Sequence, residues 1–477
     1  MTFADQIASF VAGADYRNIS SSARLQLKIR VLDALGCAIG ALESGATRAI
    51  LSQINEFGGT CLCTMIGQGK TAPDRAAFYN SALVRYLDFN DSYIAENETC
   101  HPSDNLGAVL AACEYADSTG QEFLTALAVA YQVQCRLSDV APVRARGFDH
   151  TTQGSFAVAA GVSKGLGLDP QRTAHALAIS GTAFNALRVT RTGTLSNWKG
   201  LAYPNTAFCG THATFLAMRG ITGPLEVFEG NKGFMETISG PFEIDWANED
   251  LERVRYTILK RYNAEIHSQS AIEAIIELRS QRDVTAFEVE RIDIEIFDVA
   301  FQIIGGGEEG DKTSVKTKEA ADHSLPFLVG VALLDGQVMP EQYLPERIAR
   351  SDVQSLLRKI HIRSASDLSD RFPRELPCRL TVRLRDGRNL SIHKSDYEGF
   401  LTRPMSWDKA VEKFHRLSES HATALVRDQI IEIVEEMENH PVRHLMELLQ
   451  QVGLPPNAEH VTGPVKAEKE VLQYSGI

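Results

Sequence analysis

The first half of the chain consists of one apolar segment after another, each with the residue spacing of a helix. In residues 22–42 (SARLQLKIRVLDALGCAIGAL), apolar side chains recur every three or four positions, and the serines in front can cap a helix. The same pattern predicts further helices at residues 74–87, 105–116, 121–138, 155–166, 171–187 and 205–218. Because alanine and other small residues are frequent in them, these helices can pack closely. The sequence therefore predicts a large all-helical domain.

The pattern changes after about residue 267. Residues Val289–Phe297, Arg379–Leu384 and Asn389–His393 alternate polar and apolar side chains, which is typical of strands, and Asp386-Gly387 favours a tight hairpin turn. Helical periodicity is found between these strands, at 269–281 and 319–335, and it returns at 406–436 and 440–452.

These patterns predict a mainly α fold with a smaller α+β domain. We expect four parts: a large helical domain at 1–267, an α+β domain at 268–400, a helical return at 401–455 that packs on the first domain, and a loosely ordered tail at 456–477.

The composition of the 477-residue chain excludes several kinds of protein. Hydrophobic residues make up 44% and charged residues 23%, the balance of a globular protein with a large core. The formal net charge of −13 repels nucleic acid. We find no signal peptide and no apolar run near the roughly 20 residues that a membrane-spanning helix needs. The eight cysteines are scattered without a CxxC pair, so we expect a cytoplasmic protein. From its net charge and its short apolar runs, we expect it to bind neither nucleic acid nor membrane.

Two short sequences resemble nucleotide-binding motifs, but each lacks a glycine that its motif requires. GQGKT at 67–71 lacks the first glycine of a phosphate loop, since residue 64 is threonine. GLGLDP at 165–170 lacks the third glycine of a dinucleotide site and follows a helix instead of a strand. We expect Cys61 and Cys63 to lie at the edge of a short strand and not to hold a metal. The sequence therefore predicts neither a metal nor a nucleotide cofactor.

Polar clusters between the helices are the candidate functional residues. LDFND (87–91) is followed by HPSDN (101–105), GFDHTTQG covers 147–154, and RVTRTGTLSNWKG covers 188–200. The three cations in segment 188–200 suit a polycarboxylate, because arginine binds a carboxylate through a planar fork. Further clusters are KRYNAEIHSQSAIEA (260–274) and EAADHSLPF (319–327).

Taken in order, these clusters resemble the MmgE/PrpD family of 2-methylcitrate dehydratases, and the resemblance runs from about residue 20 to 405. The family also contains cis-aconitate decarboxylase and iminodisuccinate epimerase. The resemblance implies an all-helical domain, a smaller α+β lid domain, an active site between the two, and a homodimer. It also implies activity without a metal, an iron–sulfur cluster or any other cofactor.

Four residues of this chain match the family's catalytic positions: Asp91, His101, His150 and Lys199. Around them we expect substrate-binding side chains, namely Asp104, Asn105, Arg188, Arg191, His267, Gln269 and His323. Decarboxylases of the family carry a histidine where this chain has Gln269, so its HSQ string resembles the methylcitrate dehydratases more closely.

The resemblance implies a lyase that dehydrates 2-methylcitrate, a small tricarboxylate, to 2-methyl-cis-aconitate. In our hypothesis His101 and His150 share the acid and base work, Asp91 orients one imidazole, and Lys199 with Arg188 or Arg191 stabilises the developing charge. Decarboxylation of cis-aconitate and epimerisation of iminodisuccinate remain alternatives, because all three reactions move a proton α to a carboxylate. A catalytically inactive scaffold that binds carboxylates is a more distant alternative.

Overall fold

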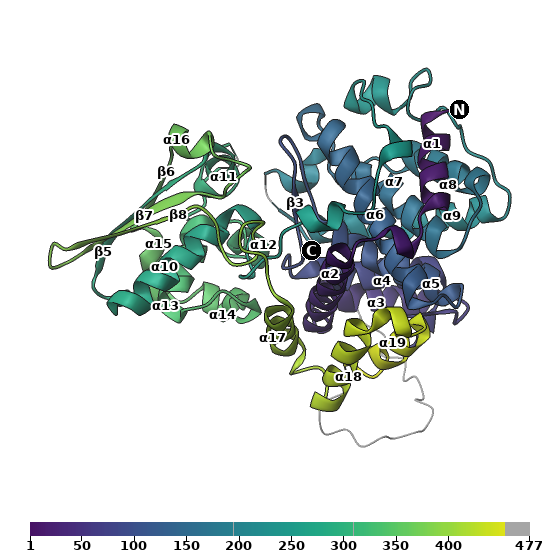
Figure 1. Cartoon of the computed structure of the whole chain (residues 1–477). Helices are drawn as coiled ribbons and strands as arrows, with labels where there is room; N and C mark the ends of the chain where they lie inside the picture. The colour runs from purple at the N-terminus through teal and green to yellow at the C-terminus, as the bar shows by residue number, and fades with distance from the viewer. Residues whose placement is uncertain (194, 309, 454–477) are drawn as a thin grey trace, which may run out of the picture.

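The computed structural model describes residues 1–193, 195–308 and 310–453. It confirms the predicted fold class, since a large helical part lies beside a smaller part that contains a mixed sheet (Figure 1). The predicted tail at 456–477 lies outside the described residues. None of the helices within the described ranges is both long and apolar enough to cross a lipid bilayer.

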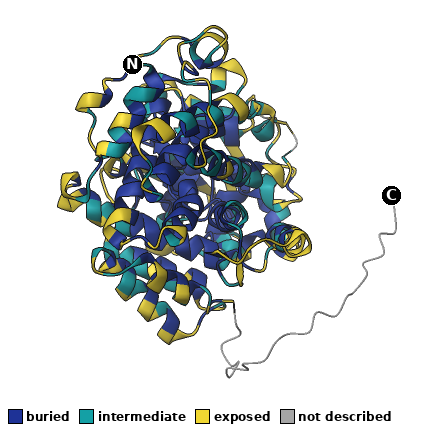
Figure 2. Cartoon of the chain, turned by 90° about the vertical axis from the view of Figure 1, so that its right-hand side faces the viewer, coloured by how far each residue is buried: buried dark blue, intermediate teal, exposed yellow. Residues whose placement is uncertain are grey.

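Nine α-helices from the first half of the chain build the larger part. They are α1 (Phe3–Gly13), α2 (Ser21–Gly40), α3 (Gly45–Phe57), α4 (Pro73–Tyr86), α5 (Leu106–Tyr115), α6 (Gly120–Val140), α7 (Thr151–Gly165), α8 (Pro170–Ala183) and α9 (Trp198–Met218). As predicted, a serine caps α2: the Ser20 hydroxyl accepts a hydrogen bond from the Ala23 amide. α5, α6 and α7 are buried along almost their whole length, so they form the centre of this part. Figure 2 shows buried segments gathered in the interior and exposed segments around the outside.

The smaller part is built on a four-stranded sheet in the order β6-β5-β7-β8. The strands are β5 (Val289–Ile296), β6 (Ile360–Ser364), β7 (Cys378–Leu384) and β8 (Asn389–Lys394). β7 and β8 form the predicted antiparallel hairpin, whereas β6 pairs with β5 in parallel. Helices α10 (Gln269–Arg282) and α13 (Leu325–Asp335) share one apolar core with the sheet.

Three helices near the C-terminus return to the larger part: α17 (Trp407–Ser418), α18 (Ala424–Glu435) and α19 (Val442–Leu449). Their apolar side chains belong to the same core as those of α1 to α8. α17 packs on α2 between the two parts of the molecule (Figure 1). Inside this contact, Lys413 and Asp33 form a buried ion pair with 2.7 Å between Nζ and Oδ1.

The structure departs from the predicted helix bounds at three points that matter below. We expected a helix to begin near Pro204, but α9 begins at Trp198 and Pro204 lies inside it. The pattern could not show this, because proline normally disfavours the interior of a helix. Ion pairs between Lys199 and distant acidic residues hold the additional first turn in place.

The other two points are breaks inside segments that were predicted to be continuous. The segment at 319–335 consists of α12 (Lys318–Ala321) and α13, because the Ser324 hydroxyl caps a new helix by accepting the Phe327 amide. The segment at 406–436 divides in the same way where Thr423 caps α18. The first break leaves Asp322 and His323 between two helices.

Candidate active site

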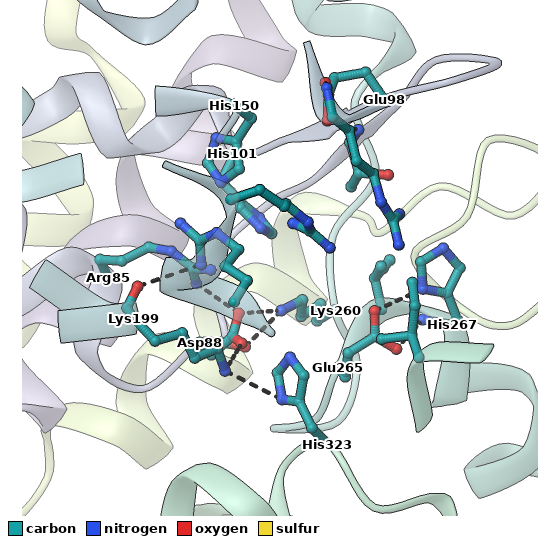
Figure 3. Close-up of a pocket in the computed structure, with 16 residues that line it drawn as sticks. Arg85, Asp88, Glu98, His101, His150, Lys199, Lys260, Glu265, His267 and His323 are labelled. Atoms are coloured by element: carbon teal, nitrogen blue, oxygen red, sulfur yellow. Dashed lines mark hydrogen bonds and ion pairs between the residues drawn. The ribbon is translucent and has the colours of Figure 1, made fainter. Parts of the chain in front are cut away.

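A pocket lies where residues of both parts of the molecule meet (Figure 3). Its lining includes four histidines, six lysine or arginine side chains and three carboxylates. The histidines are His101, His150, His267 and His323. The first two come from the larger part and the last two from the smaller part, so the pocket is complete only when both are in place.

His101 is held so that one ring nitrogen remains open. Its Nδ1 lies 2.7 Å from the backbone carbonyl oxygen of Asp91, and because a carbonyl can only accept, Nδ1 carries the proton. The neutral ring therefore has a lone pair on Nε2. Burial, together with the nearby charges of Arg85 and Lys260, holds the pKa of His101 well below its usual value. The His101 ring is therefore neutral at pH 7.

His150 stands beside it, with 5.5 Å between the two ring centroids. Its ring is 4% exposed, and neither of its nitrogens has a hydrogen-bond partner among the described residues. Burial lowers the pKa of His150 to about 3 despite the neighbouring carboxylate of Asp149. The pocket therefore contains a second neutral imidazole whose nitrogens are available to a ligand.

Asp88 stands at the centre of a buried cluster of charges. Arg85 lies 2.5 Å, Lys260 2.7 Å and Lys199 3.0 Å from its carboxylate oxygens. Burial favours the protonated form, but these three cations outweigh it and hold the pKa of Asp88 well below its usual value. The backbone of Asp88 has a φ of 55°, a left-handed conformation in which aspartate is less strained than most residues. Such strain is typical of functional sites.

Lys199 connects this cluster to the smaller part. Its Nζ lies 3.1 Å from Nδ1 of His323 and 3.4 Å from Oδ1 of Asp322, while Oδ1 of Asp322 is 2.6 Å from the His323 ring. Asp88, Asp322 and His323 have donor atoms within 4.8 Å of one another, a spacing that a metal ion could use. The ammonium group of Lys199 already contacts all three, so the chain itself supplies a cation there.

Glu265 and His267 form a carboxylate–imidazole pair on the other side of the pocket. Nδ1 of His267 lies 2.6 Å from Oε1 of Glu265, and its Nε2 has no partner among the described residues. The pair sits on a short 3-10 turn at Ile266–Ser268, where the Glu265 carboxylate also accepts the His267 amide. This geometry fixes the ring and stabilises it when it carries a second proton.

Seven of the predicted site residues line the pocket: His101, His150, Arg188, Arg191, Lys199, His267 and His323. Arg191 is bound to Asp149, with 2.6 Å between Nε and Oδ2, so it neutralises a buried carboxylate. Arg188 lies 4.0 Å from the same carboxylate.

The other four predicted residues lie behind the pocket wall. The expectation that the Asp91 carboxylate orients an imidazole is not met, because that carboxylate accepts hydrogen bonds from Ser103 and Tyr131 and only the backbone carbonyl contacts His101. Burial raises the pKa of Asp91, which these hydrogen bonds oppose. Asp91 supports His101 through its main chain.

Asp104, Asn105 and Gln269 also act inside the protein. Asp104 accepts a hydrogen bond from Asn90, and burial raises its pKa to about 7. The amide group of Asn105 bonds to Gln134 and accepts from Tyr203. Gln269 makes four hydrogen bonds to the backbone of residues 261–264. Gln269 therefore shapes the loop that carries Lys260 and does not line the pocket.

Sequence reasoning missed Arg85, Lys260 and Glu265 as site residues. Arg85 lies in the last turn of α4, and Asp88 follows it by three residues just beyond the end of the helix, close enough for the two side chains to meet. Lys260 and Glu265 lie in the segment that contains His267, but nothing local shows that Lys260 reaches Asp88, which is 172 residues away. That contact depends on the folded arrangement of the two parts.

Together the fold and the pocket define a two-domain protein whose histidines and cations surround a site suited to an anionic ligand. The chain belongs to the MmgE/PrpD family, because the model of the family's N-terminal domain matches residues 5–247 and that of its C-terminal domain matches residues 262–439. The chain is 26% identical over 397 residues to a 2-methylcitrate dehydratase of Escherichia coli (strain K12), covering 75% of this chain and 77% of the relative. It is 24% identical over 463 residues to the cis-aconitate decarboxylase of Mus musculus, covering 91% of this chain and 90% of the relative.

Proposed function

We propose that this protein is a lyase that removes water from 2-methylcitrate, or from a hydroxytricarboxylate closely similar to it, to give 2-methyl-cis-aconitate. The observation that carries the proposal is His101: a neutral ring with an open Nε2 in a pocket that six cationic side chains line. Such a pocket favours both a polycarboxylate and removal of a proton next to one of its carboxylates. The relatives named 2-methylcitrate dehydratase support the choice of substrate.

In this mechanism His101 is the general base. Its Nδ1–H keeps donating a hydrogen bond to the Asp91 carbonyl oxygen while Nε2 takes the proton α to a substrate carboxylate. His150 is also neutral, since its pKa is about 3, so it is poorly suited to donate a proton at pH 7. We assign it to hydrogen bonding with the substrate next to His101.

Negative charge develops on the carboxylate beside the carbon that loses its proton. Lys199 and Lys260 lie together on Asp88 and stabilise this charge through preorganised ammonium groups. Burial lowers the pKa of Lys260 against the opposing effect of Asp88. Removal of one such donor typically lowers the rate by about 10²–10³.

The departing hydroxyl group needs a proton, which we assign to His267. Its Nδ1 is bonded to Glu265, so a protonated ring would be charge-compensated and would present Nε2–H to the leaving group. This assignment places the base on the larger domain and the acid on the smaller one. Both side chains line the same pocket.

Decarboxylation of cis-aconitate is the second candidate. The mouse cis-aconitate decarboxylase aligns with 91% of this chain, more than the 75% covered by the E. coli dehydratase. The same base and cations would serve that reaction, with protonation after CO2 has left. Epimerisation of iminodisuccinate would need acid/base groups on opposite faces of one carbon, which His101 and His267 could also provide.

We also propose that the protein acts as a cytoplasmic homodimer. Support for a dimer comes from three exposed apolar side chains close together in sequence: Leu187 (60% exposed), Val189 (69%) and Trp198 (47%). They border a single surface hollow beside the start of α9. Apolar groups concentrated in this way are typical of protein–protein contacts. Sedimentation of the purified protein tests this point.

The test of the proposed function is direct. Metal-stripped protein is incubated separately with 2-methylcitrate, citrate, cis-aconitate and iminodisuccinate, and each mixture is followed by proton NMR. We expect 2-methylcitrate to be converted to 2-methyl-cis-aconitate without added metal. Formation of itaconate from cis-aconitate, or inversion of iminodisuccinate, would mean that the same site catalyses a different reaction of the family. The absence of conversion in all four mixtures would contradict the proposal.

A further inference from the structure

The cations that line the pocket differ in whether they form an ion pair with a carboxylate of the protein. Arg85, Lys199 and Lys260 share Asp88, and Arg191 is paired with Asp149. The guanidinium group of Arg144 has no ion pair with any described residue, although it lines the same pocket. Its positive charge is therefore available to a ligand.

The main chain of Arg144 is held in place by a buried carboxylate. Glu98 is 5% exposed, and its Oε2 accepts hydrogen bonds from the amides of Val143 (3.2 Å) and Arg144 (3.1 Å). These bonds fix the start of the 3-10 turn Arg144–Arg146 against the loop before His101. The hydrogen bonds that Glu98 makes to this turn are therefore to its backbone amides, and among the described residues none is to the Arg144 guanidinium group.

Arg144 stands at the outer end of the pocket, whereas the lysines stand at the inner end. Arg144 and Arg188 also line a second hollow, which continues outward past Asn97 and Glu308. Lys260, in contrast, is only 1% exposed. In the close-up, Lys199, Asp88 and Lys260 gather on one side, and Glu98, which marks the Arg144 turn, lies on the other (Figure 3).

We propose that Arg144 binds the carboxylate of the substrate that is farthest from the reacting carbon. An arginine fork can hold such a carboxylate through two parallel hydrogen bonds, and among the described residues no acidic side chain forms an ion pair with the Arg144 guanidinium group. The substrate would then span the pocket, with one carboxylate at Lys199 and Lys260 and another at Arg144. This inference rests on the proposed function and narrows it to substrates that carry carboxylates at both ends of a carbon chain.

Binding of an unreactive probe tests the inference. Tricarballylate (propane-1,2,3-tricarboxylate) lacks the hydroxyl group that would leave, so its affinity can be measured by calorimetry without turnover. We expect Arg144→Gln to weaken its binding by about 10- to 100-fold, as loss of charge-assisted hydrogen bonds does. The affinity of Arg144→Lys for tricarballylate should lie between those of the wild type and Arg144→Gln, because lysine keeps the positive charge but lacks the planar guanidinium group.

The matched control is Arg146→Gln on the same turn. Arg146 is exposed and does not line the pocket, so this variant should bind tricarballylate like the wild type. The Arg144 guanidinium group forms no ion pair with the residues that the structure describes, so Arg144→Gln should keep its melting temperature. Binding by Arg144→Gln within twofold of the wild type, or an equal loss in Arg146→Gln, would overturn the inference. So would a wild-type protein that does not bind tricarballylate.

Kinetics separate this inference from the proposed function. If 2-methylcitrate is dehydrated, Arg144→Gln should raise KM with little change in kcat, because the distal carboxylate is bound equally in the ground and transition states. Turnover with an unchanged KM in this variant would overturn the inference alone. Tricarballylate binding that depends on Arg144, without turnover of 2-methylcitrate, would overturn the proposed function alone.

Discussion

Replacement of His150 by phenylalanine should make the protein less sensitive to acid while removing a group from the pocket. His150 has a pKa of about 3 in the folded protein, against about 6.5 in an unfolded chain. The folded state therefore resists protonation of this ring, and as the pH falls below 6.5 the unfolded state binds a proton that the folded state does not. The ring therefore leaves the free energy of unfolding unchanged above pH 6.5 and lowers it progressively as the pH falls from 6.5 toward 3.

The size of the effect follows from those two pKa values. Between pH 7 and pH 5 the ring lowers the free energy of unfolding by about 2 kcal/mol, at about 1.4 kcal/mol for each pH unit below 6.5. In His150→Phe this loss disappears, so the change between pH 7 and pH 5 should be smaller than in the wild type by about 2 kcal/mol. At pH 7 the variant should be at least as stable, because neither nitrogen of His150 has a hydrogen-bond partner within the described part of the chain.

Urea denaturation at several pH values, followed by tryptophan fluorescence, measures this difference. The three tryptophans, Trp198, Trp246 and Trp407, all lie outside the α+β part of the chain, so their signal follows the part that contains His150. Equal pH dependence in the wild type and His150→Phe would refute the reasoning. A large loss of stability at pH 7 would refute the statement that the ring makes no structural hydrogen bond.

Two further predictions concern the support of the site and its pH dependence. Lys413→Met should lower the free energy of unfolding by about 3–5 kcal/mol, because it leaves the Asp33 carboxylate buried without a partner; a loss below about 1 kcal/mol in urea denaturation would contradict this. The acid limb of the kcat/KM profile should lie below pH 6.5, because burial lowers the pKa of His101 and a base is inactivated only below its own pKa. A limb at pH 6.5 or above would mean that His101 is not the base.

Sequence patterns correctly predicted the helices and strands that are determined by residues close together in the chain. Helix α2 follows from its periodicity and the Ser20 cap, and the β7–β8 hairpin follows from alternation around Asp386-Gly387. The parallel pairing of β6 with β5 joins residues about 70 positions apart, such as Ile292 and Ile360, so no local signal specifies it. The start of α9 was predicted wrongly for the same reason, because ion pairs with distant residues hold its first turn.

In the candidate site, too, local sequence predicted some residues and missed others whose role depends on the folded chain. Motifs indicated His101, His150 and Lys199, which line the pocket. Motifs alone did not separate side chains that face the pocket from side chains that build its wall, so Gln269 was included although it bonds only to backbone. Arg144 was missed because its proposed role depends on which cations of the pocket form ion pairs with carboxylates of the protein, and only the folded structure shows this.

The rate of dehydration by His101→Gln tests the central claim most directly. Proton NMR with 2-methylcitrate gives the rates of the wild type, of His101→Gln, and of a control, His393→Gln, which changes an exposed residue on β8. The account predicts a rate about 10²–10⁴ lower for folded His101→Gln, as expected when a general base is removed, and an unchanged rate for the control. A His101→Gln rate within threefold of the wild type would contradict the account.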